Sequence, residues 1–249
     1  MYRSLNDHLR DALIQKHLWA SNPLSFNDPF DCSIPASNIS TPAEATECVE
    51  YLLRQMEAPT PAFQAWVRNE ASNGRIPFAE DFEKGWRKSL EKAGVVCFTE
   101  RPDNLLMWAH YASQHGGLCL GFEGLSERLD LQRVQYAKTL PTLKLVDLLP
   151  PKDLEATKIR LTSKSCRWAY EREWRFILCE TKFSSNSDPH RKVPFSPNEL
   201  RRVIFGCRMP AERRQEVILL LKNWPTKIHF YEAVTHSSRF ALNLRPIEI

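Results

Sequence analysis

The chain has 249 residues, of which 43% are hydrophobic and 26% are charged; these values are typical of a protein that buries a core and exclude a disordered chain. The net charge of +4 permits a nucleic-acid partner without requiring one. The first residues lack a secretion-signal pattern, and no window approaches the roughly 20 apolar residues of a membrane span, so we expect no membrane segment.

Seven cysteines are scattered along the chain without a CxxC pair. Several lie in apolar runs such as 95–98 and 177–179, and an odd number in such settings predicts buried free thiols in a reducing compartment. The close ligand spacing of a zinc site is also absent. We therefore predict a cytoplasmic protein without a bound metal.

The first forty residues predict, in order, a strand, a helix, a strand and a loop. Leu5, Leu9 and Leu13 recur at the spacing of one helix face. The loop contains two prolines and an Asn-Asp pair, which oppose both regular structures. The two strands and the loop are expected at residues 2–3, 18–21 and 22–31.

Residues 41–92 predict a helical insertion. Thr41, Pro42 and Glu44 form the pattern of a capping box with proline at the first helical position. A second start signal, Thr60-Pro61, follows, and a third helix ends before Gly94. The insertion is therefore expected to hold three helices.

The rest of the chain consists mostly of predicted strands. The glycine pair at 116–117 predicts a turn, and no linker or phosphate-binding GxGxxG motif occurs. We therefore predict a single α+β domain over residues 1–249, with a split or curled, mainly antiparallel sheet and flanking helices. Strands are expected at 95–99, 118–122, 133–137, 168–179, 202–205 and 227–231. Helices are expected at 105–112, with Asp103-Asn104 as the N-terminal cap, and at 154–161 and 210–223.

The segment 171–178 combines charge with a strong strand pattern. Side chains alternate along a strand, so Glu171, Glu173 and Arg175 share one face. The other face, with Trp174, Phe176 and Leu178, is expected to anchor the strand in the core. Unpaired buried charges are costly, so the charged face predicts a polar cleft or, equally, a solvated edge with an ion pair.

Two further segments carry residues of chemical interest. Met107 to Tyr111 places Trp108, His110 and Tyr111 within about one helical turn, although the same residues would also suit a packed helix face. Residues 26–31 combine two aromatic side chains with an Asn-Asp-Pro turn, which would suit a loop that stacks on a flat ring or a purely structural turn.

Several of these segments, taken in order, closely resemble the bacterial family catalogued as domain of unknown function 2971. The resemblance runs from residue 1 to about residue 206, and the segment 41–92 is its least typical part. The family name carries no activity. The matching segments are 2–3, 18–21, 25–31, 96–99, 107–111, 117–122 and 170–175.

The layout also resembles a distant ADP-ribosyltransferase. That superfamily is built on a split antiparallel sheet, with Arg or His on the first strand, Ser or Tyr on the second, and Glu, sometimes within Glu-x-Glu, on a later one. Arg3, then Ser21 or Ser25, and Glu173 preceded by Glu171 follow this order. The glycines and the Ser-Thr-Ser run of the arginine-modifying members are absent.

This resemblance implies NAD as the substrate of an ADP-ribosyltransferase or NAD glycohydrolase. Cleavage of the nicotinamide–ribose bond builds positive charge on the ribose, which Glu173 would stabilise. Arg3 would hold a phosphate or ribose oxygen, Glu171 would position or deprotonate an acceptor, and His110 is a further candidate base. Tyr2, Phe26 or Trp108 would stack on nicotinamide. The candidate NAD-binding residues are Tyr2, Arg3, Ser21, Ser25, Phe26, Asn27, Asp28, Trp108, Tyr111 and Arg175.

The resemblance further implies a toxin or anti-phage effector, with a nucleic acid or a host protein as acceptor and an antitoxin or another defence protein as partner. One alternative is a metal-dependent nuclease that gathers Mg²⁺ through Asp28, Asp31, Glu171 and Glu173, although the lysine of the common ExK pattern is missing. The other is a non-enzymatic module that binds a nucleotide or a peptide in the same cleft.

Overall fold

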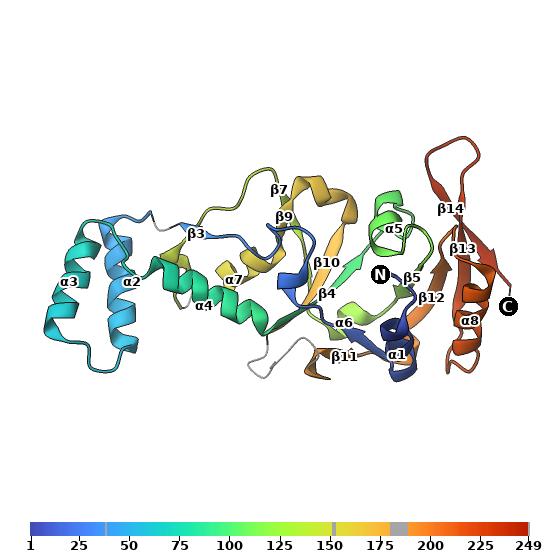
Figure 1. The fold of residues 1–249 in the computed structure, drawn as a ribbon, viewed down its shortest axis with the longest axis horizontal. Helices are drawn as coiled ribbons and strands as arrows, with labels where there is room; N and C mark the ends of the chain where they lie inside the picture. The colour runs from blue at the N-terminus through green and yellow to red at the C-terminus, as the bar shows by residue number, and fades with distance from the viewer. Residues whose placement is uncertain (38, 151–152, 180–188, 249) are drawn as a thin grey trace. The chain divides into compact units, whose positions relative to one another are not determined.

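The fold is described from a computed structural model of the chain, over residues 1–37, 39–150, 153–179 and 189–248. The chain divides into two compact units (Figure 1). The first comprises Met1–Ser21, Gly94–Val134 and Trp168–Ile249, and the second comprises Asn22–Ala93 and Gln135–Arg167. Helices accompany mainly antiparallel sheets, none of which is closed among the described residues, so the predicted α+β class is confirmed.

A five-stranded sheet forms the centre of the first unit. All its neighbouring strands are antiparallel except β12 and β13, which are parallel and joined through helix α8 (Ala211–Leu220), the kind of crossover that a parallel pair requires. Its strands, in spatial order, are β1 (Tyr2–Arg3), β5 (Leu118–Phe122), β12 (Leu200–Phe205), β13 (His229–Thr235) and β14 (Leu242–Ile247).

Two smaller sheets complete the first unit. One has the order β4 (Ala93–Thr99), β10 (Glu173–Cys179) and β6 (Leu131–Arg133), and the other pairs β11 (Lys192–Pro194) with β2 (His17–Trp19). The helices in these parts of the chain are α1 (Asp7–Gln15), α5 (Leu105–Tyr111), α6 (Leu125–Arg128) and the 3-10 helices η3 (Cys166–Glu171), η4 (Pro189–Arg191) and η5 (Pro197–Glu199).

Two of the strand predictions need correction, and one strand of the five-stranded sheet was not predicted. The strand expected at 168–179 begins only at Glu173, because residues 168–171 belong to η3 and Arg172 has a positive φ of 45° that separates the two elements. The strand expected at 133–137 is split into β6 and β7 (Gln135–Ala137). Strand β14 was missed; the alternation of Leu242 and Leu244 is a strand signal, but Pro246 weakens it.

The second unit holds the predicted helices of residues 41–92. At the first of them, Thr41 accepts a hydrogen bond from the Glu44 amide while Glu44 caps the Thr41 amide, so the predicted capping box is confirmed. Two short parallel strand pairs, β3–β8 and β7–β9, accompany the helices. The remaining bounds are α2 (Pro42–Gln55), α3 (Pro61–Ser72), α4 (Ala79–Glu91), α7 (Asp153–Thr162), η1 (Pro23–Ser25), η2 (Leu145–Leu148), β3 (Ala36–Ser37), β8 (Leu143–Lys144) and β9 (Ser163–Ser165).

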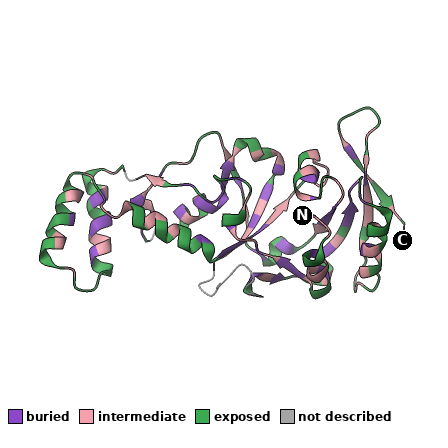
Figure 2. Ribbon diagram, in the orientation of Figure 1, coloured by how far each residue is buried: buried purple, intermediate pink, exposed green. Residues whose placement is uncertain are grey.

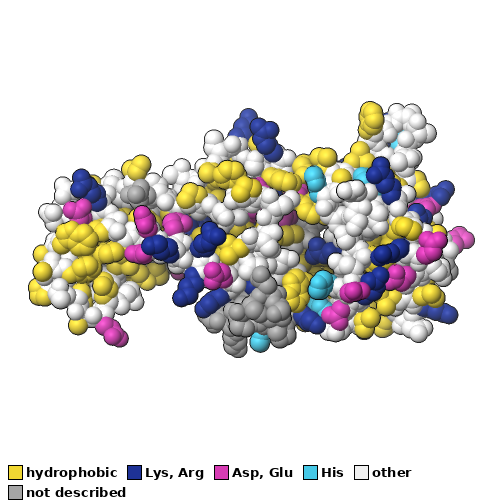
Figure 3. Space-filling model, viewed as in Figure 1, with side chains coloured by type: hydrophobic (Ala, Val, Ile, Leu, Met, Phe, Trp, Pro, Cys, Tyr) yellow, Lys and Arg dark blue, Asp and Glu magenta, His cyan; other side chains and the backbone are white. Residues whose placement is uncertain are grey.

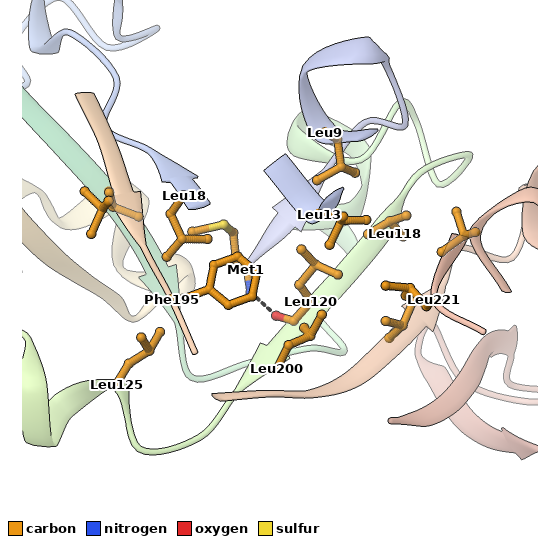
Figure 4. Close-up of a cluster of buried hydrophobic side chains, with 14 of the residues drawn as sticks. Met1, Leu9, Leu13, Leu18, Leu118, Leu120, Leu125, Phe195, Leu200 and Leu221 are labelled. Atoms are coloured by element: carbon orange, nitrogen blue, oxygen red, sulfur yellow. Dashed lines mark hydrogen bonds between the residues drawn. The ribbon is translucent and has the colours of Figure 1, made fainter. Parts of the chain in front are cut away.

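The core of the first unit lies where α1 packs against the five-stranded sheet. Figure 4 shows Leu9 and Leu13 of α1 near Leu118 and Leu120 of β5, and Figure 2 shows buried residues concentrated along β5 and β12. The amino group of Met1 donates a 2.7 Å hydrogen bond to the Leu120 carbonyl oxygen. This packing holds β1, and therefore Arg3, against β5.

The six cysteines whose side chains the structure describes, Cys32, Cys48, Cys97, Cys119, Cys166 and Cys207, are free thiols, as predicted. Their burial was predicted only in part, because Cys166 is exposed while Cys32, Cys48 and Cys119 are buried. No helix in the described ranges is both long and apolar enough to cross a bilayer.

Gly117 allows the close approach of β1 and β5. A Cβ atom at this position would lie 2.4 Å from the Arg3 carbonyl oxygen and 2.9 Å from that of Ala112, and neither backbone atom can move away independently. We expect Gly117→Ala to lower the free energy of unfolding by about 1–3 kcal/mol in urea titrations. Gly85→Ala is the matched control, since a Cβ there meets nothing within 4 Å. Equal effects of the two substitutions would contradict this account.

Candidate functional site

The first unit contains a cavity of about 830 Å³, here called the Arg3 cavity. It is built by α1, α5 and the strands β1, β2, β5 and β11 together with their flanking residues. Four of the predicted site residues line it: Arg3, Ser21, His110 and Tyr111. Figure 3 shows histidine side chains on the visible face beside α1 and beside α5, the two helices that contribute His8 and His110 to the lining. The tertiary structure thus gathers residues that lie up to 108 positions apart in the sequence.

Arg3 is the cation of this cavity that lacks a carboxylate partner among the described residues. Its Nη1 donates a long hydrogen bond, 3.4 Å, to the Tyr2 carbonyl oxygen. Burial lowers the pKa of Arg3 below its ordinary value, and the neighbouring thiols of Cys97 and Cys119 oppose that shift. A guanidinium stays protonated in proteins, so this half-buried fork presents a positive charge that a ligand anion can pair with.

A buried carboxylate stands one hydrogen bond away from the cavity. The Tyr111 hydroxyl donates to Glu171 Oε1 at 2.7 Å, and Glu171 is only 2% exposed. Its position is held through the backbone, because the Thr99 hydroxyl donates to the Glu171 carbonyl oxygen and Arg172 turns the chain with its positive φ. Tyr111 therefore connects the cavity with Glu171.

Asn104 ties the first strand to the same region. The Tyr2 hydroxyl accepts a hydrogen bond from the Asn104 amide at 3.2 Å and donates to the Arg101 carbonyl oxygen at 2.7 Å. The Asn104 side chain donates to the Tyr170 carbonyl oxygen at 3.2 Å. Asn104 also caps the N-terminus of α5, which was predicted and is confirmed. The hydrogen bonds by which Asn104 links Tyr2 with Tyr170 could not be predicted from the sequence.

The rings of Tyr2 and Trp108 are occupied with packing. They meet edge to face with centroids 5.0 Å apart, and His115 stacks on Trp108 at 6.5 Å. Trp108 is fully buried and donates its indole N–H to the Pro102 carbonyl oxygen at 2.9 Å. Burial raises the pKa of Tyr2 well above its ordinary value, so the hydroxyl stays protonated. Trp108 thus presents no free face on which nicotinamide could stack.

Glu173 and Arg175 neutralise each other inside the protein. Their two parallel contacts, Nε to Oε1 at 2.9 Å and Nη2 to Oε2 at 3.0 Å, form a bidentate pair, and the residues are 5% and 0% exposed. Trp174, by contrast, is partly exposed and donates its indole N–H to Glu100. The prediction that Trp174, Phe176 and Leu178 anchor the strand in the core therefore holds only in part. Phe176 packs, partly buried, against the core of the first unit, but the ion-paired face is the more buried one.

The loop residues Ser25, Phe26, Asn27 and Asp28 belong to the second unit, whereas the Arg3 cavity is built by the first unit alone. The Ser25 hydroxyl donates to the Asn22 carbonyl oxygen, and buried Asp28 accepts a 3.0 Å hydrogen bond from the Phe30 amide. These are the contacts of the structural turn that we considered for this loop.

Asp31 forms a buried ion pair with Lys164 at 3.3 Å within the second unit. Across the described residues, no three His, Cys, Asp or Glu side chains lie close enough together to hold a metal ion.

Four residues of the cavity lining with ionisable side chains were not predicted: His8, Asp11, His17 and Lys192. The spacing of His8 and Asp11 on a predicted helix is a signal that they share a face. Lys192 joins them through the pairing of β11 with β2, where Lys192 stands opposite Trp19. That contact spans more than 170 residues and leaves no local pattern in the sequence.

Residues 107–176 match the model of a family described as "Protein of unknown function (DUF2971)", which supports the predicted resemblance to that family. The matched segment includes His110, Tyr111, Glu171 and Glu173. No curated protein and no solved structure matches the chain.

Proposed function

We propose that the Arg3 cavity binds NAD and that the protein is an ADP-ribosyltransferase or NAD glycohydrolase. The observation that carries this proposal is the presence, at one cavity, of Arg3, which has no carboxylate partner among the described residues, and of Tyr111, which is hydrogen-bonded to the buried carboxylate of Glu171. The volume of about 830 Å³ is in the range of small-molecule and cofactor sites.

The two charged groups suit two parts of NAD, its phosphate groups and the ribose whose bond to nicotinamide is cleaved. The planar fork of Arg3 matches the oxygens of a phosphate group. Cleavage of the bond between nicotinamide and ribose builds positive charge at the sugar, and a carboxylate in a water-poor site stabilises such charge strongly. We assign this role to Glu171 in place of Glu173, because Arg175 already neutralises Glu173. His110, exposed at the cavity, is the candidate base for an acceptor.

The acceptor that we propose is a nucleic acid or a host protein, as expected of a toxin or anti-phage effector with an antitoxin or another defence protein as its partner. Water as the acceptor would make the protein a glycohydrolase. Incubation with NAD labelled on its adenylate portion, in the presence of total RNA or lysate, separates these cases, since only transfer labels a macromolecule.

The test is nicotinamide release from NAD, measured by chromatography. We expect Arg3→Gln and Glu171→Gln each to reduce the rate by about 10²–10³-fold, the range found when one oriented electrostatic contact to a transition state is removed. Glu212→Gln, at an exposed position of α8, is the matched control and should release nicotinamide at the wild-type rate. If the wild type and the three variants released nicotinamide equally fast, the reaction would not take place at the Arg3 cavity.

One observation favours a non-enzymatic binding module as the second candidate. Glu173, the carboxylate to which the resemblance to ADP-ribosyltransferases assigns catalysis, is ion-paired with Arg175. Saturable NAD binding that requires Arg3 but releases no nicotinamide would favour the binding module over the enzyme. Absence of NAD binding would overturn both the enzyme and the binding module.

A further inference from the structure

Trp19 is an aromatic residue of the Arg3 cavity to which the proposed function gives no role. It is the last residue of β2, and it lines the cavity together with Arg3. Side chains alternate along a strand, so Trp19 leaves β2 on the face opposite Leu18, which belongs to the core of the first unit. Trp19 is partly exposed and, among the described residues, is not one of the apolar side chains packed against that core. Its ring is therefore directed to the cavity and not to the core.

The indole of Trp19 has no partner in the part of the chain that the structure describes. The two other aromatic side chains of the lining are engaged, because Tyr111 donates to Glu171 and Phe195 packs edge to face on Phe122 at 5.3 Å. Trp19 makes no ring contact, cation contact or side-chain hydrogen bond with the described residues. Its indole nitrogen is not among the buried atoms that lack a partner, so this nitrogen is open to solvent. Such a side chain at a cavity suits a flat ligand with polar edges.

The chemistry of a dinucleotide indicates which ring Trp19 would meet. The diphosphate of NAD lies between its two nucleosides, so a diphosphate held by Arg3 sends the nucleosides in different directions. Tyr111, which contacts Glu171, belongs to α5, and α5 packs against the strand that carries Arg3. Trp19 comes from β2, which pairs with β11 in a separate sheet. Because nicotinamide has to lie beside Glu171, where its bond to ribose breaks, adenine is the ring left for Trp19.

We infer that the indole of Trp19 stacks on the adenine ring of the nucleotide whose phosphates bind Arg3. Purine and indole are both flat and bicyclic, and every base has a face on which an aromatic side chain can stack. This inference rests on the proposed nucleotide-binding role of the Arg3 cavity, although not on NAD cleavage. It makes Trp19 a ligand-binding residue that the predicted site does not include.

The experiment compares the affinities of ADP and nicotinamide mononucleotide at pH 7.5 by calorimetry. We expect Trp19→Ala to bind ADP about tenfold more weakly than the wild type, the effect of removing one stack between a base and an aromatic ring. The same variant should bind the mononucleotide, which has no adenine, as the wild type does. Arg3→Gln should weaken the binding of both, since both carry phosphate. Trp66→Ala, at a 48% exposed tryptophan of the second unit, is the matched control and should bind both ligands normally.

Four outcomes would each overturn the inference: unchanged ADP affinity in Trp19→Ala, an equal loss of affinity for both ligands, a loss for the mononucleotide alone, or absence of ADP binding to the wild type. ADP binding that depends on Trp19, without nicotinamide release, would uphold it and overturn only the proposed NAD cleavage. Nicotinamide release by a Trp19→Ala protein that binds ADP as tightly as the wild type would do the reverse.

A second measurement follows the indole itself and guards against a Trp19→Ala protein that does not fold. Stacking of adenine on Trp19 should quench part of the tryptophan fluorescence of the wild type at saturating ADP. Trp19→Phe retains a ring, so it should keep most of the ADP affinity but lose this quenching. Quenching that persists unchanged in Trp19→Phe would assign the stacked ring to another tryptophan and contradict the inference.

Discussion

Replacing Glu173 by alanine lowers the free energy of unfolding by about 3–5 kcal/mol, because it leaves the guanidinium of Arg175 buried without its bidentate partner. The attraction within such a pair only offsets the desolvation of its members, so the penalty appears when one charge is removed alone. Urea unfolding followed by far-ultraviolet circular dichroism measures the change. The same loss is expected for Glu173→Gln, which retains the shape but removes the negative charge.

The double substitution Glu173→Leu with Arg175→Met is the control that separates charge from shape. Replacement of both partners by apolar residues of similar volume should restore most of the stability, since neither charge is then left unpaired. A single substitution that costs less than about 1 kcal/mol would show that water reaches the pair. The result also governs the design of activity tests, because a Glu173 variant that loses NAD chemistry through unfolding says nothing about catalysis.

Trp108→Ala is expected to lower the free energy of unfolding by about 3–5 kcal/mol, the range for a large aromatic side chain removed from a core. The cavity left between Tyr2 and His115 would lack both ring contacts, and the Pro102 carbonyl oxygen would lose its donor. Thermal or urea unfolding measures this. Trp66→Ala, at a side chain that is 48% exposed, is the matched control and should cost less than about 1 kcal/mol.

A further substitution at Trp108 distinguishes a ring that only packs in the core from one that stacks on nicotinamide. Trp108→Phe retains most of the ring volume, so its NAD affinity should equal that of the wild type if the ring only packs. A large loss of NAD affinity in a folded Trp108→Phe protein would contradict the buried environment described for this ring and would restore the predicted stacking role.

The candidate site could be predicted in part, and Arg3, Tyr111 and Glu171 show why. Arg3 was predicted from the resemblance to ADP-ribosyltransferases, Glu171 from the charge pattern of residues 171–178 and the same resemblance, and Tyr111 from the segment 107–111. Their connection through Tyr111 and Asn104 depends on packing of α5 against β1 and the end of η3, which no spacing in the sequence expresses. His17 was missed because a histidine at a strand start has no distinguishing local pattern.

The sequence by itself determined the elements whose causes are local. The Thr41 capping box, the Asn104 cap and strand β5 depend on residues within a few positions of one another, and all three formed where predicted. Only the tertiary structure decided which face of β10 is buried and which residues share the Arg3 cavity. Those outcomes follow from contacts such as that of Lys192 with Asp11, 181 positions apart, whose free energy exists only once the intervening chain has folded.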